Sequence, residues 1–137
     1  MKKLIIAVIG YGGMGSHHVH HLLAQSERYQ LAGIVDISPK RQHVAKKCGL
    51  RVYENQAALL ADVQVDVVLV ATPNDSHKTI AIAAMKAGKH VICEKPATIT
   101  AEDLNEIVAV AKRTKRYFIV HQNRRWDPDF LISDLSN

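Results

Sequence analysis

Short apolar runs alternate along the chain with segments in which apolar residues recur at helical spacing. Runs of this length, rich in Val and Ile, are typical of strands that helices cover on both faces. Six of them predict strands at 4–9, 31–35, 51–53, 65–70, 90–93 and 117–120. Regular strand–helix alternation favours right-handed βαβ units. We therefore predict an α/β chain with a Rossmann-type, doubly wound parallel sheet, strand order 3-2-1-4-5-6, and helices on both faces.

Polar caps and glycines mark the ends of the intervening helices. Ser38 followed by Pro39 is typical of a helix start, and Gly49 of a helix end. Thr100 begins a further helix, with Asp103 three residues later in a pattern that resembles a capping box. After it, residues at i, i+3, i+4 and i+7 spacing predict a stripe facing the core, consisting of Leu104, Ile107, Val108 and Ala111.

A glycine-rich loop follows the first predicted strand, with the sequence Gly10-Tyr11-Gly12-Gly13-Met14-Gly15. It matches the pattern G-x-G-x-x-G, and Asp36 ends the second strand about twenty residues later, as dinucleotide-binding folds require. The glycines allow a tight turn, close approach of a pyrophosphate and close packing of the helix, whose N-terminus attracts the anion. A carboxylate at Asp36 accepts hydrogen bonds from ribose hydroxyls. The loop therefore predicts a dinucleotide site.

Asp36 also bears on the choice of cofactor. A carboxylate repels the 2′-phosphate of NADP, so the sequence favours NAD. Lys40 and Arg41 follow closely and oppose that repulsion, which leaves NADP as the alternative. Ile37 and Arg41 are counted among the predicted cofactor contacts.

Two more polar segments, 71–77 and 93–96, follow the fourth and fifth predicted strands. Ligands of open α/β sheets bind at the carboxyl ends of strands. Glu94 and Lys95 place a carboxylate and an ammonium where a nicotinamide is expected, and a lysine there can polarise a substrate oxygen. An exposed loop ion pair is the alternative interpretation of these two residues.

Together these segments resemble the glucose-fructose oxidoreductase, inositol dehydrogenase and rhizopine-catabolism (Gfo/Idh/MocA) family over nearly the whole chain. The resemblance rests on the glycine loop, His18, Asp36, Thr72-Pro73-Asn74 with His77, Glu94-Lys95-Pro96, and Asn123-Arg124-Arg125-Trp126-Asp127-Pro128. It implies that Lys95 is catalytic and contacts the nicotinamide ribose and the substrate, while Glu94 orients it. It also implies cofactor contacts from Thr72, Pro73, Asn74, His77 and Asn123.

The resemblance implies hydride transfer between a nicotinamide cofactor and a sugar, cyclitol or related polyol. Two alternatives stay open: an NAD-dependent glycoside hydrolase, and a non-catalytic dinucleotide-sensing regulatory protein. An intact Lys95 argues against the sensor.

Family members are longer and carry a second domain. We therefore interpret residues 1–122 as the dinucleotide-binding domain and 123–137 as the start of the crossover to a substrate and oligomerisation domain. We expect this chain alone to be inactive and the longer protein to be a homo-oligomer.

Composition changes this picture little. The 137 residues, 47% hydrophobic and 23% charged, suit one globular domain. No apolar run reaches the roughly 18 residues of a membrane span, and no export signal follows the basic start, so a cytoplasmic location is expected. The net charge of +5 reflects basic residues gathered after residue 111, namely Lys112, Arg113, Lys115, Arg116, Arg124 and Arg125. A solvated helix end and an anionic ligand explain them better than nucleic acid.

Histidines and cysteines provide no metal site. Cys48 and Cys93 match no CxxC pattern, which excludes a disulfide framework and a cysteine-rich zinc site. His17 and His21 are four residues apart, but no carboxylate or cysteine lies beside them at helical spacing. Cys93, at the end of an apolar strand, is predicted to be a small core residue.

Overall fold

The computed structural model describes residues 3–72, 77–94 and 100–121, apart from the side chains of Met14, His18, Glu94 and His121. Within these ranges, no helix is both long enough and apolar enough to cross a membrane.

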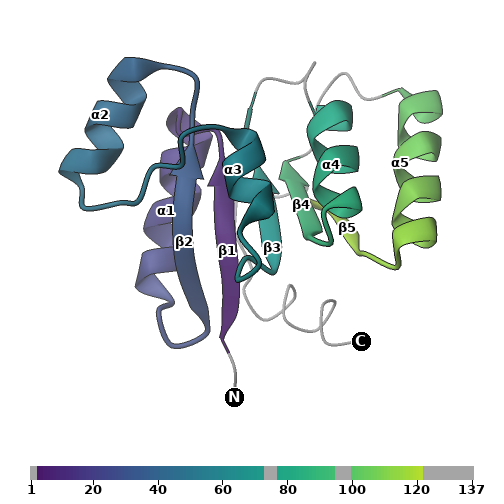
Figure 1. Ribbon diagram of the computed structural model, residues 1–137, viewed down its shortest axis with the longest axis horizontal. Coiled ribbons are helices and arrows are strands. Elements are labelled where there is room, and N and C mark those ends of the chain that lie inside the picture. Colours follow the sequence, from purple (N-terminus) through teal and green to yellow (C-terminus); the bar gives the residue numbers. More distant parts are fainter. Residues whose placement is uncertain (1–2, 73–76, 95–99, 122–137) are drawn as a thin grey trace.

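A parallel sheet forms the centre of the molecule, with its strands in the order β2-β1-β3-β4-β5 (Figure 1). The strands are β1 (Leu4–Ile9), β2 (Tyr29–Val35), β3 (Val67–Val70), β4 (His90–Glu94) and β5 (Phe118–His121). Every neighbouring pair is parallel. The chain therefore presents all carboxyl ends at one edge of the sheet.

The predicted third strand at 51–53 is reduced to a single parallel bridge between Val52 and Ile34. Ile34 donates to the carbonyl of Arg51 and accepts from Tyr53, each at 2.9 Å. The extended segment stops there because Asn55 caps the next helix through a 2.8 Å bond from the N–H of Ala58. With this bridge counted beside β2, the predicted order 3-2-1-4-5-6 is confirmed.

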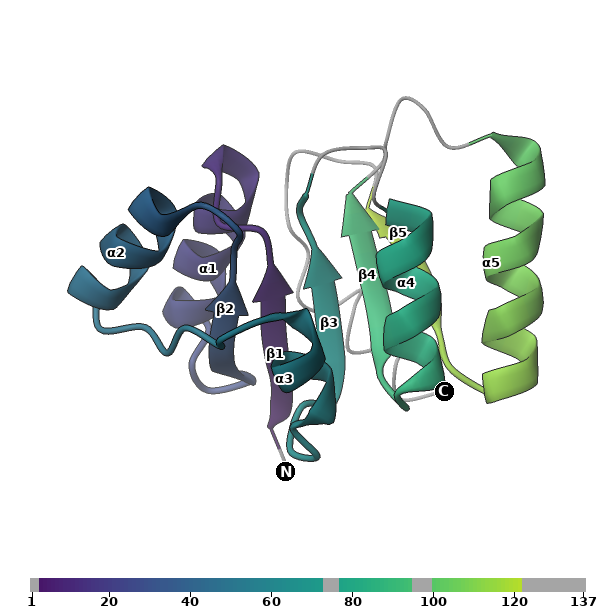
Figure 2. The same cartoon turned by 45° about the horizontal axis from the view of Figure 1, so that its top comes forward.

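Helices cover both faces of the sheet, as predicted. They are α1 (Gly13–Ala24), α2 (Pro39–Lys47), α3 (Gln56–Ala61), α4 (His77–Lys86) and α5 (Ala101–Thr114). Figure 2 shows α1 behind the sheet and α3 and α4 in front of it. Two separate cores result: one contains Val19 and Leu22 of α1, and the other contains Ile80 of α4 and Ile107 of α5. Strand β3 is buried on both faces, which explains its unbroken apolar sequence.

Most predicted helix ends are confirmed by their caps. Ser38 accepts a 3.4 Å bond from the N–H of Arg41, and Pro39 is the first residue of α2. Gly49 follows that helix with φ +80°, a left-handed conformation that favours glycine. Thr100 caps α5 by accepting a 3.0 Å bond from the N–H of Asp103.

The predicted core stripe of α5 is wrong at two of its four positions. Ile107 is fully buried, but Leu104 and Val108 are each 38% exposed. Val110, which the spacing did not select, is buried instead. Helix α5 packs against α4, and Lys78 of α4 forms ion pairs with two carboxylates of α5. Neighbouring helices, and not the helix alone, decide which side faces the core.

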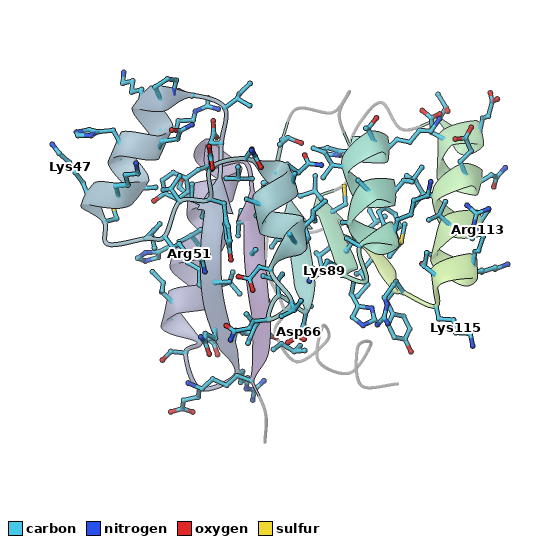
Figure 3. All side chains as sticks on the ribbon, viewed as in Figure 1. Lys47, Arg51, Asp66, Lys89, Arg113 and Lys115 are labelled. Atoms are coloured by element: carbon cyan, nitrogen blue, oxygen red, sulfur yellow. The ribbon has the colours of Figure 1, made fainter. Side chains whose placement is uncertain are left out.

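Charged groups at the amino ends of the strands are bonded within the fold. Lys89, labelled in Figure 3, is only 5% exposed and donates a 2.6 Å bond to the carbonyl of Asp62. Asp66, labelled beside it, accepts a 3.0 Å bond from the N–H of Ile5. These contacts secure the starts of β1 and β4, while the candidate site lies at the opposite edge of the sheet.

Candidate functional site

The glycine loop leaves the carboxyl end of β1 and opens α1 (Figure 2). Gly10 has φ +99°, and a Cβ there would lie 2.8 Å from the carbonyl oxygen of Ala71. At Gly15 a Cβ would lie 1.9 Å from the carbonyl oxygen of Gly10. For a Cβ at Gly12 the nearest atoms would be those of the Arg41 guanidinium, at 3.4 Å. Packing therefore requires glycine at Gly10 and Gly15, whereas Gly12 leaves the loop backbone open to a ligand.

The start of α1 is suited to an anion. Gly12 is the N-cap and has no side chain to accept bonds from the N–H groups of the first turn. No acidic side chain occupies that turn. Free N–H groups and the positive end of the helix dipole are what a pyrophosphate needs.

Asp36 connects the glycine loop to the start of α2. Its side chain is 3% exposed, and the carboxylate accepts bonds from two backbone N–H groups, that of Tyr11 at 2.7 Å and that of Ser38 at 2.8 Å. The Gln42 side chain donates a 2.6 Å bond to the Asp36 carbonyl. Each carboxylate oxygen can accept a second bond, which leaves capacity for ribose hydroxyls. The sequence predicted the ribose contact and missed the bond to the loop.

A hollow of about 520 Å³ separates the glycine loop from α2 and has a volume typical of ligand sites. It is lined by Tyr11, Gly12, Ser16, Ser38, Lys40, Arg41 and Val44. The Arg41 guanidinium lies 3.7 Å from the Asp36 carboxylate and its side chain is 54% exposed. Ile37, the next residue after Asp36, is 98% exposed and offers an apolar surface. The structure thus brings Tyr11, Gly12, Asp36 and Arg41 together.

Tyr11 contributes a neutral phenol to this hollow. Burial raises the pKa of Tyr11, and its hydrogen bond with the nearby Cys48 thiol raises that pKa further. Cys48 is exposed and follows the last residue of α2. The sequence offered no signal for this contact, because it depends on how α2 folds back toward the loop.

Thr72 and His77, which follow β3, form the second part of the candidate site. His77 is 2% exposed, and its Nε2 lies 2.7 Å from the carbonyl oxygen of Thr72. The Cys93 Sγ lies 3.1 Å from His77 Nδ1. Cys93 is fully buried, as predicted for a core residue, but its contact with His77 was not foreseen. His77 is thereby bonded to the backbone of Thr72.

Several predicted site residues lie outside the described residues, namely Pro73, Asn74, Lys95 and Asn123. The backbones of Gly13, Met14 and Glu94 are described, and Glu94 ends β4 in register with His121 of β5. The roles given to the side chains of Met14 and Glu94 remain predictions.

His17 and His21 lie side by side on α1. Their Nε2 atoms are 3.2 Å apart and their rings meet edge to face. In the part of the chain that the structure describes, no group of three His, Cys, Asp or Glu side chains is arranged to hold a metal ion.

The described basic residues at the end of α5 do not line the hollow beside the glycine loop. Arg113 and Lys115, labelled in Figure 3, point outward at the end of α5. Lys47, at the end of α2, lies on the opposite side of the molecule in the same view. Arg124 and Arg125 lie outside the described residues. Lys112 and Arg113 stand in the last turn of α5, where the helix dipole favours cations.

Comparisons with known proteins agree with this geometry. The chain matches the oxidoreductase family with an NAD-binding Rossmann fold over residues 4–122. An NAD-binding protein from Listeria innocua, known from its crystal structure, is 53% identical with a TM-score of 0.85, over 96% of this chain and 39% of that protein. The WlbA dehydrogenase of Chromobacterium violaceum, solved with NADH and UDP-GlcNAcA, is 31% identical with a TM-score of 0.82, over 91% and 37% of the two chains.

Among curated proteins, inositol 2-dehydrogenase 2 of Saccharopolyspora erythraea is 35% identical over 129 residues, covering 92% of this chain and 38% of that enzyme. The chain thus spans little more than a third of the length of these relatives. The family match includes every described strand and helix and both parts of the site. From this extent of agreement we conclude that the chain belongs to the Gfo/Idh/MocA oxidoreductase family and forms its NAD-binding Rossmann domain.

Proposed function

We propose that this chain is the cofactor-binding part of a dehydrogenase that moves a hydride between NAD and one carbon of a sugar, cyclitol or related polyol. The observation that carries the proposal is the buried Asp36 carboxylate, which accepts bonds from the N–H groups of Tyr11 and Ser38, two residues that line the 520 Å³ hollow. The adenosine half of the dinucleotide would occupy this hollow. The pyrophosphate would lie against Gly12 and the N-terminus of α1.

NAD is the preferred cofactor in this proposal. Asp36 supplies a negative charge where NADP carries its 2′-phosphate. Arg41 weakens that preference because its guanidinium lies 3.7 Å from the same carboxylate. The WlbA relative was solved with NADH, which supports the same choice.

Lys95 and Glu94 are proposed to serve the reacting end of the cofactor. When bound, the nicotinamide accepts or returns the hydride. Lys95 follows β4 in the chain and would donate a hydrogen bond to the reacting oxygen of the substrate. Its ammonium would then stabilise the negative charge that develops on that oxygen. Glu94 would orient the lysine, and Thr72, Pro73, Asn74 and Asn123 would line the cofactor.

The rest of the catalytic machinery is proposed to lie in a further domain. Residues 1–122 would form the dinucleotide-binding domain and 123–137 the start of the crossover. This chain alone would then bind cofactor without turnover. A cytoplasmic location and homo-oligomeric assembly of the longer protein belong to the same proposal, and cell fractionation and light scattering test them.

The dehydrogenase is favoured over a glycoside hydrolase and over a regulatory sensor by the relatives themselves. Inositol 2-dehydrogenase 2 and the WlbA dehydrogenase, at 35% and 31% identity, are both named for oxidation–reduction chemistry. Turnover separates the alternatives, since a dehydrogenase accumulates NADH while a hydrolase releases free sugar.

The testing experiment has two stages. Calorimetry measures NAD and NADP binding to this chain, and a longer protein containing it is then screened for NADH production with cyclitols and sugars.

In that longer protein we expect Lys95→Ala to lower kcat by about 10²–10³, the effect of losing one preorganised donor. NAD affinity should stay within a few-fold. Lys95→Arg should also be poor, because a planar guanidinium does not replace a compact ammonium. Unchanged kcat with a large loss of NAD affinity would make Lys95 a cofactor anchor.

A further inference from the structure

Two buried contacts link Cys93, near the end of β4, through His77 to Thr72, which follows β3. Cys93 is fully buried and His77 is 2% exposed. The Cys93 Sγ lies 3.1 Å from His77 Nδ1, and His77 Nε2 lies 2.7 Å from the carbonyl oxygen of Thr72. Since β3 and β4 are neighbours with Val70 in register with Cys93, these contacts bridge two adjacent strand ends.

The partners determine where the imidazole proton lies. A carbonyl oxygen only accepts, so the Nε2 of His77 must carry the hydrogen that faces Thr72. In the neutral ring, Nδ1 is then an acceptor. The Cys93 thiol is the donor that lies against it, at 3.1 Å. The thiol therefore stabilises the one tautomer that can hold Thr72.

Ala71 and Thr72 in turn pack against the glycine loop. A Cβ at Gly10 would lie 2.8 Å from the Ala71 carbonyl oxygen and 3.1 Å from the Thr72 Cγ2. The N–H of Ala71 donates a 2.9 Å bond to the carbonyl of Ile9, the last residue of β1. Residues 71 and 72 thus form the wall against which the glycine loop turns. A shift of the Thr72 backbone moves the surface that shapes the pyrophosphate site.

We propose that Cys93 is a positioning residue for the dinucleotide site. Its thiol sets the tautomer and orientation of His77, and His77 holds the Thr72 backbone against the glycine loop. Cys93 itself is fully buried, and we attribute its effect on the site to this contact. The claim that His77 affects NAD affinity rests on the proposed function. The claim that the Cys93 thiol sets the His77 tautomer does not depend on it.

The experiment compares Cys93→Ala with Cys93→Ser in this chain. Two-dimensional ¹H–¹⁵N spectra of the imidazoles report the His77 tautomer, with the signals assigned from His77→Gln. Calorimetry reports NAD affinity. In the wild type we expect the Nε2–H form of His77. Cys93→Ala should allow the other tautomer to appear and lower NAD affinity about 3–10-fold, the equivalent of one hydrogen bond. Cys93→Ser keeps a donor and should restore both properties.

Val91→Ala is the matched control. Val91 is also fully buried on β4 and belongs to the same core cluster, but it lies two residues before Cys93. It should lower thermal stability while leaving the His77 signals and NAD affinity unchanged.

Two results would overturn the proposal. One is Cys93→Ala with an unchanged His77 tautomer and NAD affinity. The other is an equal loss of affinity in Val91→Ala, which would make Cys93 a packing residue only. If the wild-type chain binds no NAD, the proposed function fails, and the His77 spectra still decide whether the thiol sets the tautomer.

Discussion

The carboxylate of Asp36 accepts a 2.7 Å hydrogen bond from the backbone N–H of Tyr11, which precedes it by 25 residues. The acid at the end of β2 thereby fastens the glycine loop at the end of β1. Its other oxygen accepts from the N–H of Ser38, the N-cap of α2. One buried side chain thus bonds both the glycine loop and the first residue before α2.

Replacement of Asp36 separates these contributions. NAD should bind the wild-type chain more tightly than NADP. Asp36→Ala should weaken NAD binding by more than about tenfold, or 1.4 kcal/mol, because both the loop bond and the ribose contact are lost. It should also reduce the difference between NAD affinity and NADP affinity, because the charge that repels a 2′-phosphate is gone. Calorimetry measures both affinities.

Asp36→Asn provides the control for charge. An amide keeps one acceptor oxygen for a backbone N–H, so the loss of NAD affinity should be smaller than in Asp36→Ala. Tenfold tighter binding of NADP than NAD by the wild-type chain would contradict the assignment of Asp36.

Arg41 should govern the binding of NADP more than that of NAD. Its guanidinium lies 3.4 Å from an ideal Cβ at Gly12 and 3.7 Å from the Asp36 carboxylate, so it can reach a 2′-phosphate. Arg41→Ala should lower NADP affinity several-fold more than NAD affinity. Lys47→Ala also removes one positive charge, from the last turn of α2, and should change NAD affinity and NADP affinity equally little. Equal loss of both cofactors in Arg41→Ala would refute a phosphate contact.

Alanine substitutions at Gly15 and Gly12 should have different effects, the first on the stability of the chain and the second on its NAD affinity. In Gly15→Ala the new Cβ would lie 1.9 Å from the Gly10 carbonyl oxygen, so the chain should be strongly destabilised or fail to fold. In Gly12→Ala the nearest neighbour of the new Cβ is the Arg41 guanidinium at 3.4 Å, which can shift, so the melting temperature should change little. NAD affinity should nevertheless fall, because the pyrophosphate then meets a methyl group. Calorimetric scans and NAD titrations test both variants. An unchanged affinity in Gly12→Ala would place the pyrophosphate elsewhere.

Stability should decrease below neutral pH because of His90. Burial lowers the pKa of His90 below its ordinary value of 6.5, and Arg116 lowers it further, while Asp66 opposes the shift. Its Nδ1 accepts a 3.0 Å bond from the N–H of Tyr117, and that bond is lost when Nδ1 is protonated. The unfolded chain binds this proton more readily. The stabilisation is therefore present above about pH 6.5 and is lost as the pH falls through the depressed folded pKa.

His90→Asn isolates this contribution. The asparagine oxygen can replace Nδ1 as the acceptor and does not titrate. Urea unfolding at about pH 7.5 and about pH 5 measures the free energy of unfolding on both sides of the window. The decrease toward low pH should be smaller in the variant. An equal decrease in both proteins would exclude His90 as its source.

Local sequence was sufficient for most of the secondary structure. Continuous apolar runs predicted the strands because a parallel sheet covered on both faces excludes polar side chains from its strands. Ser38, Gly49 and Thr100 predicted helix ends because caps depend on groups within a few residues. The glycine loop and Asp36 predicted a dinucleotide site for a similar reason. The loop follows β1 and Asp36 follows β2, and the one helix that connects these adjacent strands fixes the number of residues between them.

Tertiary structure decided what depends on packing between distant segments. The buried side of α5 follows from its contact with α4, so spacing alone misplaced Leu104 and Val108. The bond from Tyr11 to Asp36 and the contact of Cys93 with His77 arise only when neighbouring strands bring their ends together. A sequence pattern records which face of an element is apolar. It does not record which polar atoms the assembled sheet places within hydrogen-bond distance, because that distance is set by every element packed between them.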